Sequence, residues 1–338
     1  MAEHVLDQIV AELRERATTL YPNRGDLRNI RVVGHTPKTD HFVYDLVADF
    51  VNCGERIAVK VYRSGKSPQA ARNQALAEYN NLERVHTAFS RHDLSGVPRP
   101  LGNFSALGAV VSEKIQGVPL QSMMMKAALL PGYDDNTSLR EAAARAGEWL
   151  CNFHRLTAGP TQVFDGQQLL SELESLCLSC RGEGLDNEAI QMILTGARNS
   201  LTHARKSIPS SAVLKDFTPL SIVVRENGVG VCDYGKMSAE GVSFSDAATF
   251  LASVEALEKY PFCNREITGR VQESFLQAYG ASSADQAVLR VLKMRALLSM
   301  FAQGRGVKES AVRKKVMWAT VMKRFIQQAA SRSLAPAA

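Results

Sequence analysis

The chain has 338 residues and a formal net charge of +6, and 45% of its residues are hydrophobic and 22% charged. This composition is typical of a globular protein with enough residues for two modest domains, and no segment approaches the roughly 20 consecutive apolar residues of a membrane span. The opening residues, "MAEHVLDQIVAELRERATTLYP", place apolar side chains at helical intervals among charged ones, unlike the unbroken apolar run of a signal peptide. We therefore expect a cytoplasmic protein.

Basic residues are concentrated at the end of the chain. From Arg290 onward there are 11 Lys and Arg residues against one acid, Glu309, a balance of +10 that leaves −4 for the rest. The simplest interpretation is a solvated helix face. The alternative is that basic C-terminal helices bind a phosphorylated ligand or an anionic surface, with the protein peripheral at a membrane; nucleic acid is not an expected partner.

The first 115 residues have strand character with one long helix. The segment "IRVVGHTPKTDHFVYDLVADFVNCGERIAVKVYRSG" alternates apolar and polar residues around turn signals, which predicts three antiparallel strands. The segment "SPQAARNQALAEYNNLERVHTAFSRH" has helical periodicity, with Leu76, Tyr79, Leu82 and Val85 as its expected apolar stripe. Strand character returns in "VPRPLGNFSALGAVVSEKIQGVPL".

Residues 116–338 read as mainly helical. Helical periodicity predicts helices near 138–156, 167–180, 187–206, 246–259, 264–279, 284–303 and 308–332. Only one hairpin is expected to interrupt them. Cys177 and Cys180 form a C-x-x-C pair in an apolar helical run, where packing is favoured over metal or redox chemistry because no second pair completes a zinc site.

The expected hairpin lies within "VLKDFTPLSIVVRENGVGVCDYGKM", residues 213–237. An Asn-Gly turn between alternating apolar residues predicts paired strands over 222–224 and 229–232. Asp216 precedes the first strand and Asp233 follows the second, so both are expected near the same end of the hairpin. Two carboxylates placed together repel one another. A bound cation would offset that repulsion.

This order of elements resembles the protein-kinase-like fold, an α+β bilobal arrangement with an N-terminal lobe over 1–115 and a helical C-terminal lobe over 116–338. "IAVKVY" resembles the lysine motif of the third strand, with Lys60 at the lysine and Glu78 as its helix partner. "VVSEKIQG" resembles the hinge, which implies that the backbone of Glu113 and Ile115 contacts adenine.

Within that fold the chain most resembles the aminoglycoside phosphotransferase and choline kinase-like family, as an atypical member. "AGEWLCNFHRLTAG" is similar to that family's "LH" helix, "DFTPLSIVV" to the part of its "HGDFxPxNILV" loop from the aspartate onward, and Asp246 stands at the aspartate that follows the metal-binding segment. His154, on the first of these, is expected to be a packed helix residue.

The resemblance implies roles for individual residues with ATP and Mg²⁺ as cofactors. Asp233 would bind Mg²⁺, Asp216 would act as the catalytic base, and Lys60 would contact phosphates. Gly34 and Thr39, in the turn "GHTPKTDHF", would cover the phosphates in place of several glycines. The family's "HGD" is Leu-Lys-Asp here, and its asparagine ligand is Ser221, whose hydroxyl would take over metal binding.

The resemblance and the departures from it suggest two alternative functions. The first is an ATP-dependent phosphotransferase that moves the γ-phosphate to a hydroxyl of a small-molecule acceptor. The segment "YPFCNREITGRVQESFLQAYG" and the basic tail resemble members linked to polysaccharide metabolism, which suggests a saccharide or glycolipid precursor. The alternative is a pseudokinase-like module that binds a nucleotide or partner without catalysis, because the catalytic loop departs from the family pattern.

Overall fold

The computed structural model describes residues 2–63, 67–130, 136–181, 185–260, 263–303 and 326–328. The chain divides into two compact units, the first formed by Met1–Val118 with Val223–Met237 and the second by Pro119–Ile222 with Ser238–Ala338. Residues 223–237, which the sequence analysis grouped with 116–338, thus pack with the first unit.

The first unit is built on a five-stranded antiparallel sheet in the order β1-β2-β3-β5-β4. Its strands are β1 (Leu27–Pro37), β2 (His41–Phe50), β3 (Gly54–Tyr62), β4 (Pro100–Phe104) and β5 (Ala109–Glu113). The three predicted N-terminal strands are therefore confirmed.

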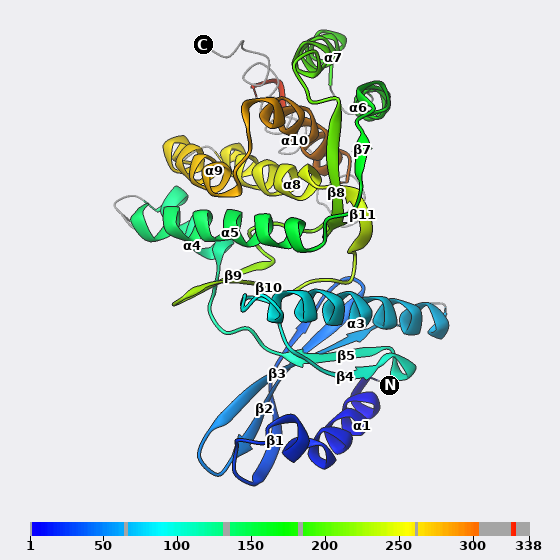
Figure 1. Cartoon of the computed structure of the whole chain (residues 1–338), viewed down its shortest axis with the longest axis vertical. Helices are drawn as coiled ribbons and strands as arrows, with labels where there is room; N and C mark the ends of the chain where they lie inside the picture. Colours follow the sequence, from blue (N-terminus) through cyan, green and yellow to red (C-terminus); the bar gives the residue numbers. More distant parts are fainter. Residues whose placement is uncertain are drawn as a thin grey trace, which may run out of the picture. The chain divides into compact units, whose positions relative to one another are not determined.

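Helices cover both faces of this sheet (Figure 1). Helix α1 (Ala2–Glu15), followed by the short α2 (Ala17–Leu20), inserts Leu6, Ile9 and Leu13 into an apolar cluster with sheet residues such as Ile57 and Val59. Because side chains alternate along a strand, Lys60 and Tyr62 point to the opposite face. That face meets α3 (Pro68–Ser90).

The buried face of α3 differs from the predicted stripe. Leu82 and Val85 are buried as expected, but Leu76 is 42% exposed and Tyr79 is only partly buried. The helix instead turns its small residues Ala71 and Ala75 inward, in line with the buried Glu78. The small side chains let the helix approach the sheet closely, and that approach brings the Glu78 carboxylate to Lys60.

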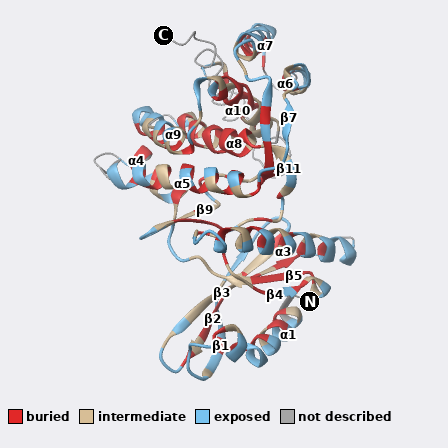
Figure 2. Cartoon of the chain, in the orientation of Figure 1, coloured by how far each residue is buried: buried red, intermediate tan, exposed pale blue. Residues whose placement is uncertain are grey.

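The second unit contains α4 (Leu120–Leu129), α5 (Asn136–Leu156), α6 (Gly166–Arg181), α7 (Asn187–Leu201), α8 (Phe244–Glu255), α9 (Arg265–Tyr279) and α10 (Ser283–Gln303), and η2 (Ala256–Lys259) continues α8. Long buried stretches of α8 and α10 form its interior (Figure 2). Helices α5 and α9 touch at Gly147, where a Cβ would lie 2.4 Å from the Phe275 carbonyl oxygen. The predicted helix over 308–332 lies outside the described residues except at 326–328.

The expectation that one hairpin alone interrupts the helices was wrong. A second sheet, in the order β11-β8-β7, is formed by β7 (Thr161–Val163), β8 (Ser207–Val213) and β11 (Ser238–Val242). These strands are short, and β8 carries a proline and three serines in seven residues. Such a segment has little of the alternating β-branched pattern on which strand prediction depends.

The predicted hairpin is confirmed as β9 (Ile222–Arg225) and β10 (Gly228–Val231), which adjoin β6 (Val118–Pro119) in a small sheet. Gly228 adopts φ = 148°, a conformation that other residues rarely tolerate. A short 3-10 turn, η1 (Ser105–Leu107), joins β4 and β5. None of the described helices is long and apolar enough to cross a membrane.

Candidate active site

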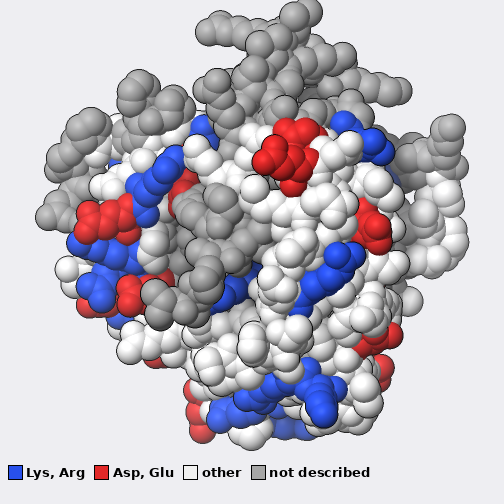
Figure 3. All heavy atoms as spheres, turned by 90° about the horizontal axis from the view of Figure 1, so that it is seen from above, with Lys and Arg blue, Asp and Glu red and all other residues white. Residues whose placement is uncertain are grey.

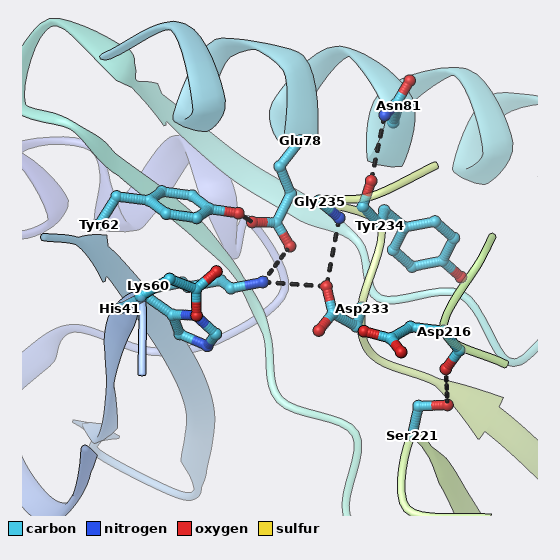
Figure 4. A network of polar contacts seen from close by, with 11 residues as sticks. His41, Lys60, Tyr62, Glu78, Asn81, Asp216, Ser221, Asp233, Tyr234 and Gly235 are labelled. Carbon is cyan, nitrogen blue, oxygen red and sulfur yellow. Dashed lines mark hydrogen bonds and ion pairs between the residues drawn. The ribbon is translucent and has the colours of Figure 1, made fainter. Parts of the chain in front are cut away.

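A buried group of charges in the first unit joins three segments distant in sequence. The Lys60 ammonium on β3 lies 2.9 Å from Glu78 Oε1 on α3 and 3.0 Å from Asp233 Oδ1 after β10. Figure 4 shows the ammonium between the two carboxylates. The structure thus brings together three residues that the sequence analysis selected. Their functional roles remain predictions.

Tyr62 completes this charged group. Its hydroxyl donates to Glu78 Oε2, so both oxygens of a carboxylate that is only 4% exposed are hydrogen-bonded. Burial, followed by the charge of Glu78, raises the pKa of Tyr62, which stays a hydrogen-bond donor. The sequence analysis missed Tyr62, although its position two residues after Lys60 on a strand places both on one face.

The charges of the group stabilise one another. Burial alone would lower the pKa of Lys60, but Glu78 and Asp233 outweigh it and leave this pKa raised. Burial would likewise raise the pKa of Asp233, but Lys60 outweighs it and leaves that pKa lowered. Both groups are therefore charged at neutral pH, with a fixed cation available for an anionic ligand.

Asp233 is held by one oxygen only. Its Oδ1 accepts from Lys60 and, at 3.2 Å, from the Gly235 N–H, whereas Oδ2 has no hydrogen bond or ion pair to the described residues. Asn81 on α3 fixes the following segment by donating to the Tyr234 and Met237 carbonyl oxygens at 3.1 and 3.3 Å. The second carboxylate oxygen is therefore positioned and available for a metal ion.

Gly235 is required by close packing. A Cβ at this position would lie 2.5 Å from the Tyr62 hydroxyl and 3.5 Å from Glu78 Oε2. Any larger residue would displace Tyr62 from Glu78. The glycine that follows Asp233 and Tyr234 thus lets this segment approach the buried charges.

The donor set fits a magnesium ion bound mainly through phosphate. Among the described residues no cluster of three or more His, Cys, Asp or Glu side chains forms a complete cage for a metal. Mg²⁺ at phosphate-transfer sites usually takes one or two carboxylates, with phosphate and water oxygens filling the remaining positions. A single free oxygen on Asp233 satisfies that requirement.

The predicted hinge residues lie at the end of β5 and just after it. The Glu113 N–H donates to the Arg99 carbonyl at 2.9 Å, and the Glu113 carboxylate pairs with the Arg99 guanidinium at 2.7 Å. The Ile115 N–H has no backbone hydrogen bond among the described residues. A backbone carbonyl and N–H, such as those of Glu113 and Ile115, are an acceptor and a donor of the kind that a purine edge pairs with.

The predicted phosphate-covering turn connects β1 and β2. Thr39 is exposed in the four-residue turn that the Lys38 N–H closes on the His41 carbonyl at 2.8 Å. Gly34 lies opposite Asp45 beside a register shift, and a Cβ there would make ordinary contact at 3.4 Å. Neither residue contacts the group around Lys60 in this structure. His41, which the sequence analysis did not select, is buried on the Lys60 face.

The second unit holds Asp216 in a tightly constrained loop. The fully buried Asp246 carboxylate accepts from the Leu214 and Lys215 N–H groups at 2.8 and 2.9 Å. Phe217, also fully buried, packs on Trp149 with 6.0 Å between ring centroids. The residues on both sides of Asp216 are therefore fixed.

His154 belongs to the support of this loop. It is 7% exposed, with Nε2 at 3.3 Å from Asp246 Oδ2 and Nδ1 at 3.0 Å from the Tyr279 hydroxyl. This position agrees with the expected packing role. The ring contacts Asp246 directly and so helps to fix its orientation.

Lys215 and Ser221 show how the departures from the family motif are accommodated. Lys215 takes the left-handed conformation, with φ = 64°, at the position where the motif has glycine. The Ser221 hydroxyl lies 2.9 Å from both the Asp216 carbonyl oxygen (Figure 4) and the Thr218 carbonyl oxygen, so its one hydrogen is shared between them, and it accepts from the Thr218 N–H. Ser221 therefore holds the loop backbone, and its metal-binding role remains a prediction.

The C-terminal basic residues lie largely outside the described part of the chain. Of those that are described, Lys293 pairs with Glu255 at 2.5 Å and Arg295 with Glu172 at 2.6 Å. On the face in Figure 3, Lys and Arg side chains alternate with Asp and Glu. The anionic-surface hypothesis depends on residues that the structure does not describe.

The predicted packing of the cysteine pair is confirmed. Cys177 and Cys180 are both fully buried on α6. Burial raises the pKa of the Cys177 thiol to about 12, which keeps it protonated and unreactive.

The comparisons with known proteins bear on the fold. No protein-family model matches the chain, and no curated protein does. Among solved structures, a choline/ethanolamine kinase family protein from Mesorhizobium loti has a TM-score of 0.53 at 14% identity, over 97% of this chain and 99% of that one.

Two further structures contain bound nucleotide. A thermostable mutant of an aminoglycoside phosphotransferase with AMP-PNP and hygromycin B has a TM-score of 0.53 at 15% identity, over 95% of this chain and 99% of that one. A glucosamine kinase with glucosamine, ADP and phosphate has a TM-score of 0.51 at 15% identity, over 91% and 95%. The predicted resemblance to this group of small-molecule kinases is confirmed at the level of the fold.

Proposed function

We propose that this protein is an ATP-dependent phosphotransferase that transfers the γ-phosphate to a hydroxyl of a small molecule. The observation that carries the proposal is the Lys60 ammonium held between Glu78 and Asp233 at 2.9 and 3.0 Å. A buried lysine with two carboxylate partners is expensive to build. Its position on the third strand of a kinase-type sheet supplies the reason, since it fixes a cation for phosphates.

Each candidate site residue of the first unit has a role in the proposed reaction. The Glu113 carbonyl and the Ile115 N–H hold adenine, and Lys60 contacts the α- and β-phosphates. Gly34 and Thr39 cover the phosphates. Asp233 Oδ2 would hold Mg²⁺, which when bound neutralises the charge of the phosphate oxygens.

Asp216 would accept the proton of the attacking hydroxyl. Its carboxylate follows a backbone that Asp246 fixes at two N–H groups, and the buried Phe217 anchors the other side. Such fixation favours a positioned base, because phosphoryl transfer depends mainly on orientation and charge neutralisation. Ser221 would steady the same loop and supply a weaker oxygen ligand.

The acceptor that we propose is a saccharide or a glycolipid precursor. Of the neighbours described above, the glucosamine kinase structure contains glucosamine and the aminoglycoside phosphotransferase structure contains hygromycin B. Sugar-like hydroxyls are therefore the first class to screen.

A second candidate is a binding module without catalysis. It is favoured by Ser221, whose hydroxyl contacts only backbone atoms of its own loop where the family motif has an asparagine ligand. Such a module would bind nucleotide through the first unit but transfer no phosphate.

Thermal unfolding with ATP, with Mg²⁺ and with both tests nucleotide binding. A ligand at about 100 times its Kd adds roughly 2.7 kcal/mol to the free energy of unfolding. We expect stabilisation by ATP and Mg²⁺ together in the wild type, and its loss in Asp233→Asn. Asp7→Asn, an exposed change on α1, is the matched control. No stabilisation of the wild type would refute nucleotide binding.

ADP release with a panel of sugars, amino sugars and choline then separates the two candidates. We expect Asp216→Asn to bind ATP as the wild type does and to lose turnover. Wild-type binding without turnover on any acceptor of the panel would favour the non-catalytic module. Full turnover by Asp216→Asn would show that the base is wrongly assigned.

A further inference from the structure

The turn between β1 and β2 carries a buried histidine that the proposed roles leave unused. His41 is 8% exposed, and it lies directly across from Tyr62 in the β2–β3 register, two pairs beyond Val43 and Lys60. Residues paired across antiparallel strands share a face, and diagonal neighbours are within reach of long side chains. His41 therefore belongs to the same face of the sheet as the Lys60 ammonium, as Figure 4 shows.

The ring has a fixed orientation. Nδ1 lies 2.7 Å from Asp40 Oδ1, and the ring packs on Tyr62 with 5.7 Å between centroids. The turn itself is fixed, because the Arg63 N–H donates to the Asp40 carbonyl at 2.9 Å. Nε2 has no hydrogen-bond partner among the described residues. Nε2 is also not among the side-chain atoms closed off from solvent. An imidazole with one nitrogen fixed and the other open is arranged to bind a ligand.

Position and chemistry indicate the ligand. The turn is the one expected to cover the phosphates, and it lacks the several glycines whose backbone amides usually approach phosphate closely. We propose that His41 binds the phosphate chain of the nucleotide through Nε2, while Asp40 fixes the ring through Nδ1. The inference rests on the proposed nucleotide binding and adds a binding residue to it.

This contact couples nucleotide binding to the uptake of a proton by the His41 ring. With Nδ1–H directed to Asp40, a neutral ring has only a lone pair at Nε2 and cannot donate to a phosphate oxygen. In the free protein, burial and then Lys60 lower the pKa of His41, against the opposing effects of Asp40 and Asp233. A bound phosphate adds negative charge beside the ring. The ring then takes up a proton and becomes a donor to both Asp40 and the phosphate.

Calorimetric titration with ADP and Mg²⁺ tests this inference. Measured at pH 7.5 in two buffers of different ionisation enthalpy, it gives both the affinity and the number of protons taken up. We expect the wild type to take up more protons per nucleotide than His41→Gln, by up to about one. We also expect His41→Gln to bind at least about tenfold more weakly, because it loses a charge-assisted hydrogen bond.

Two other variants separate binding from folding. Asp40→Asn keeps the ring but removes the carboxylate, and we expect it to reduce proton uptake while the protein stays folded. His92→Gln makes the same chemical change at an exposed position after α3, and should match the wild type in both quantities.

The outcomes are distinct. Unchanged proton uptake in His41→Gln overturns the inference, even with weaker binding, because a merely structural role would lower affinity alone. Unchanged uptake in a folded Asp40→Asn likewise overturns the role of Asp40. Absence of binding by the wild type overturns the proposed function itself, and the inference with it.

Discussion

Removal of the Asp246 carboxylate should destabilise the second unit by an amount that follows from its contacts. The side chain is fully buried and accepts from two backbone N–H groups at 2.8 and 2.9 Å. In Asp246→Ala both donors lose their acceptor, the Leu214 N–H in the interior and the Lys215 N–H at a partly buried position. A buried donor left unpaired costs about 1–3 kcal/mol, so about 2–6 kcal/mol is the upper range for the pair. Water that enters the vacated space would offset part of this, so we expect about 3 kcal/mol.

Trp149 provides a local probe for this measurement. Its ring packs on Phe217, next to Asp216, so its fluorescence reports on the loop that Asp246 holds. The chain has two tryptophans, and a Trp318→Phe background leaves Trp149 as the only tryptophan whose fluorescence is measured. Urea unfolding of this background, with and without Asp246→Ala, gives the difference in free energy from the shift in midpoint.

The matched control is Glu273→Ala, which removes an exposed carboxylate from α9 of the same unit. It should change the free energy of unfolding by no more than about 0.5 kcal/mol. A comparably small loss in Asp246→Ala would refute the reasoning, because it would mean that the two N–H groups find other partners at no cost.

Three further changes have defined outcomes. Lys215→Gly should stabilise the protein to urea by up to about 1 kcal/mol, because it relieves a left-handed residue. Gly235→Ala should destabilise it by about 1–3 kcal/mol in the same assay, because its Cβ would displace the Tyr62 hydroxyl. The pKa of Asp233 is lowered because Lys60 outweighs burial, so its stabilising contribution is present above its unfolded pKa and lost as pH falls through the folded value. The stability difference between wild type and Asp233→Asn, measured in EDTA, should therefore shrink as pH falls from about 6 to about 3.

Each of these changes has its own control. Lys215→Ala keeps a Cβ at a left-handed position and should give none of the gain of the glycine variant. Gly269→Ala lies within α9 with open space around its Cβ, so it should stabilise by about 0.5–1 kcal/mol where Gly235→Ala destabilises. A stability difference for Asp233→Asn that stays constant across the acid range would contradict the assigned pKa shift.

The parts of the fold that the sequence predicted depend on local patterns. The alternation around Lys60 and the Asn227-Gly228 turn specify strands and a hairpin without help from distant residues. The β7–β8–β11 sheet was missed because its strands are stabilised by pairing with partners about 25 to 50 residues away in the chain rather than by their own composition.

In the candidate site, too, some residues were predicted from local sequence and others depend on the folded structure. Lys60, Glu78 and Asp233 were recognisable from motif spacing, and the structure joins them by ion pairs. His41 and Tyr62 were missed because their relation depends on the strand register, which the sequence does not display. The inward position of Glu78 depends likewise on the small alanines of α3, whereas an apolar stripe places larger side chains there.

The loop around Asp216 shows how an atypical sequence can keep an ordered path. The contacts that define its path are to backbone atoms: Asp246 accepts from two N–H groups, and the Ser221 hydroxyl lies within hydrogen-bond distance of two carbonyl oxygens. Backbone contacts do not depend on which side chain occupies the neighbouring position. Lysine at 215 therefore adds local strain of about 1–2 kcal/mol without removing the contacts that orient Asp216. Because strain of this kind persists where the surrounding structure over-determines it, the loop keeps its path in spite of the departures at 215 and 221.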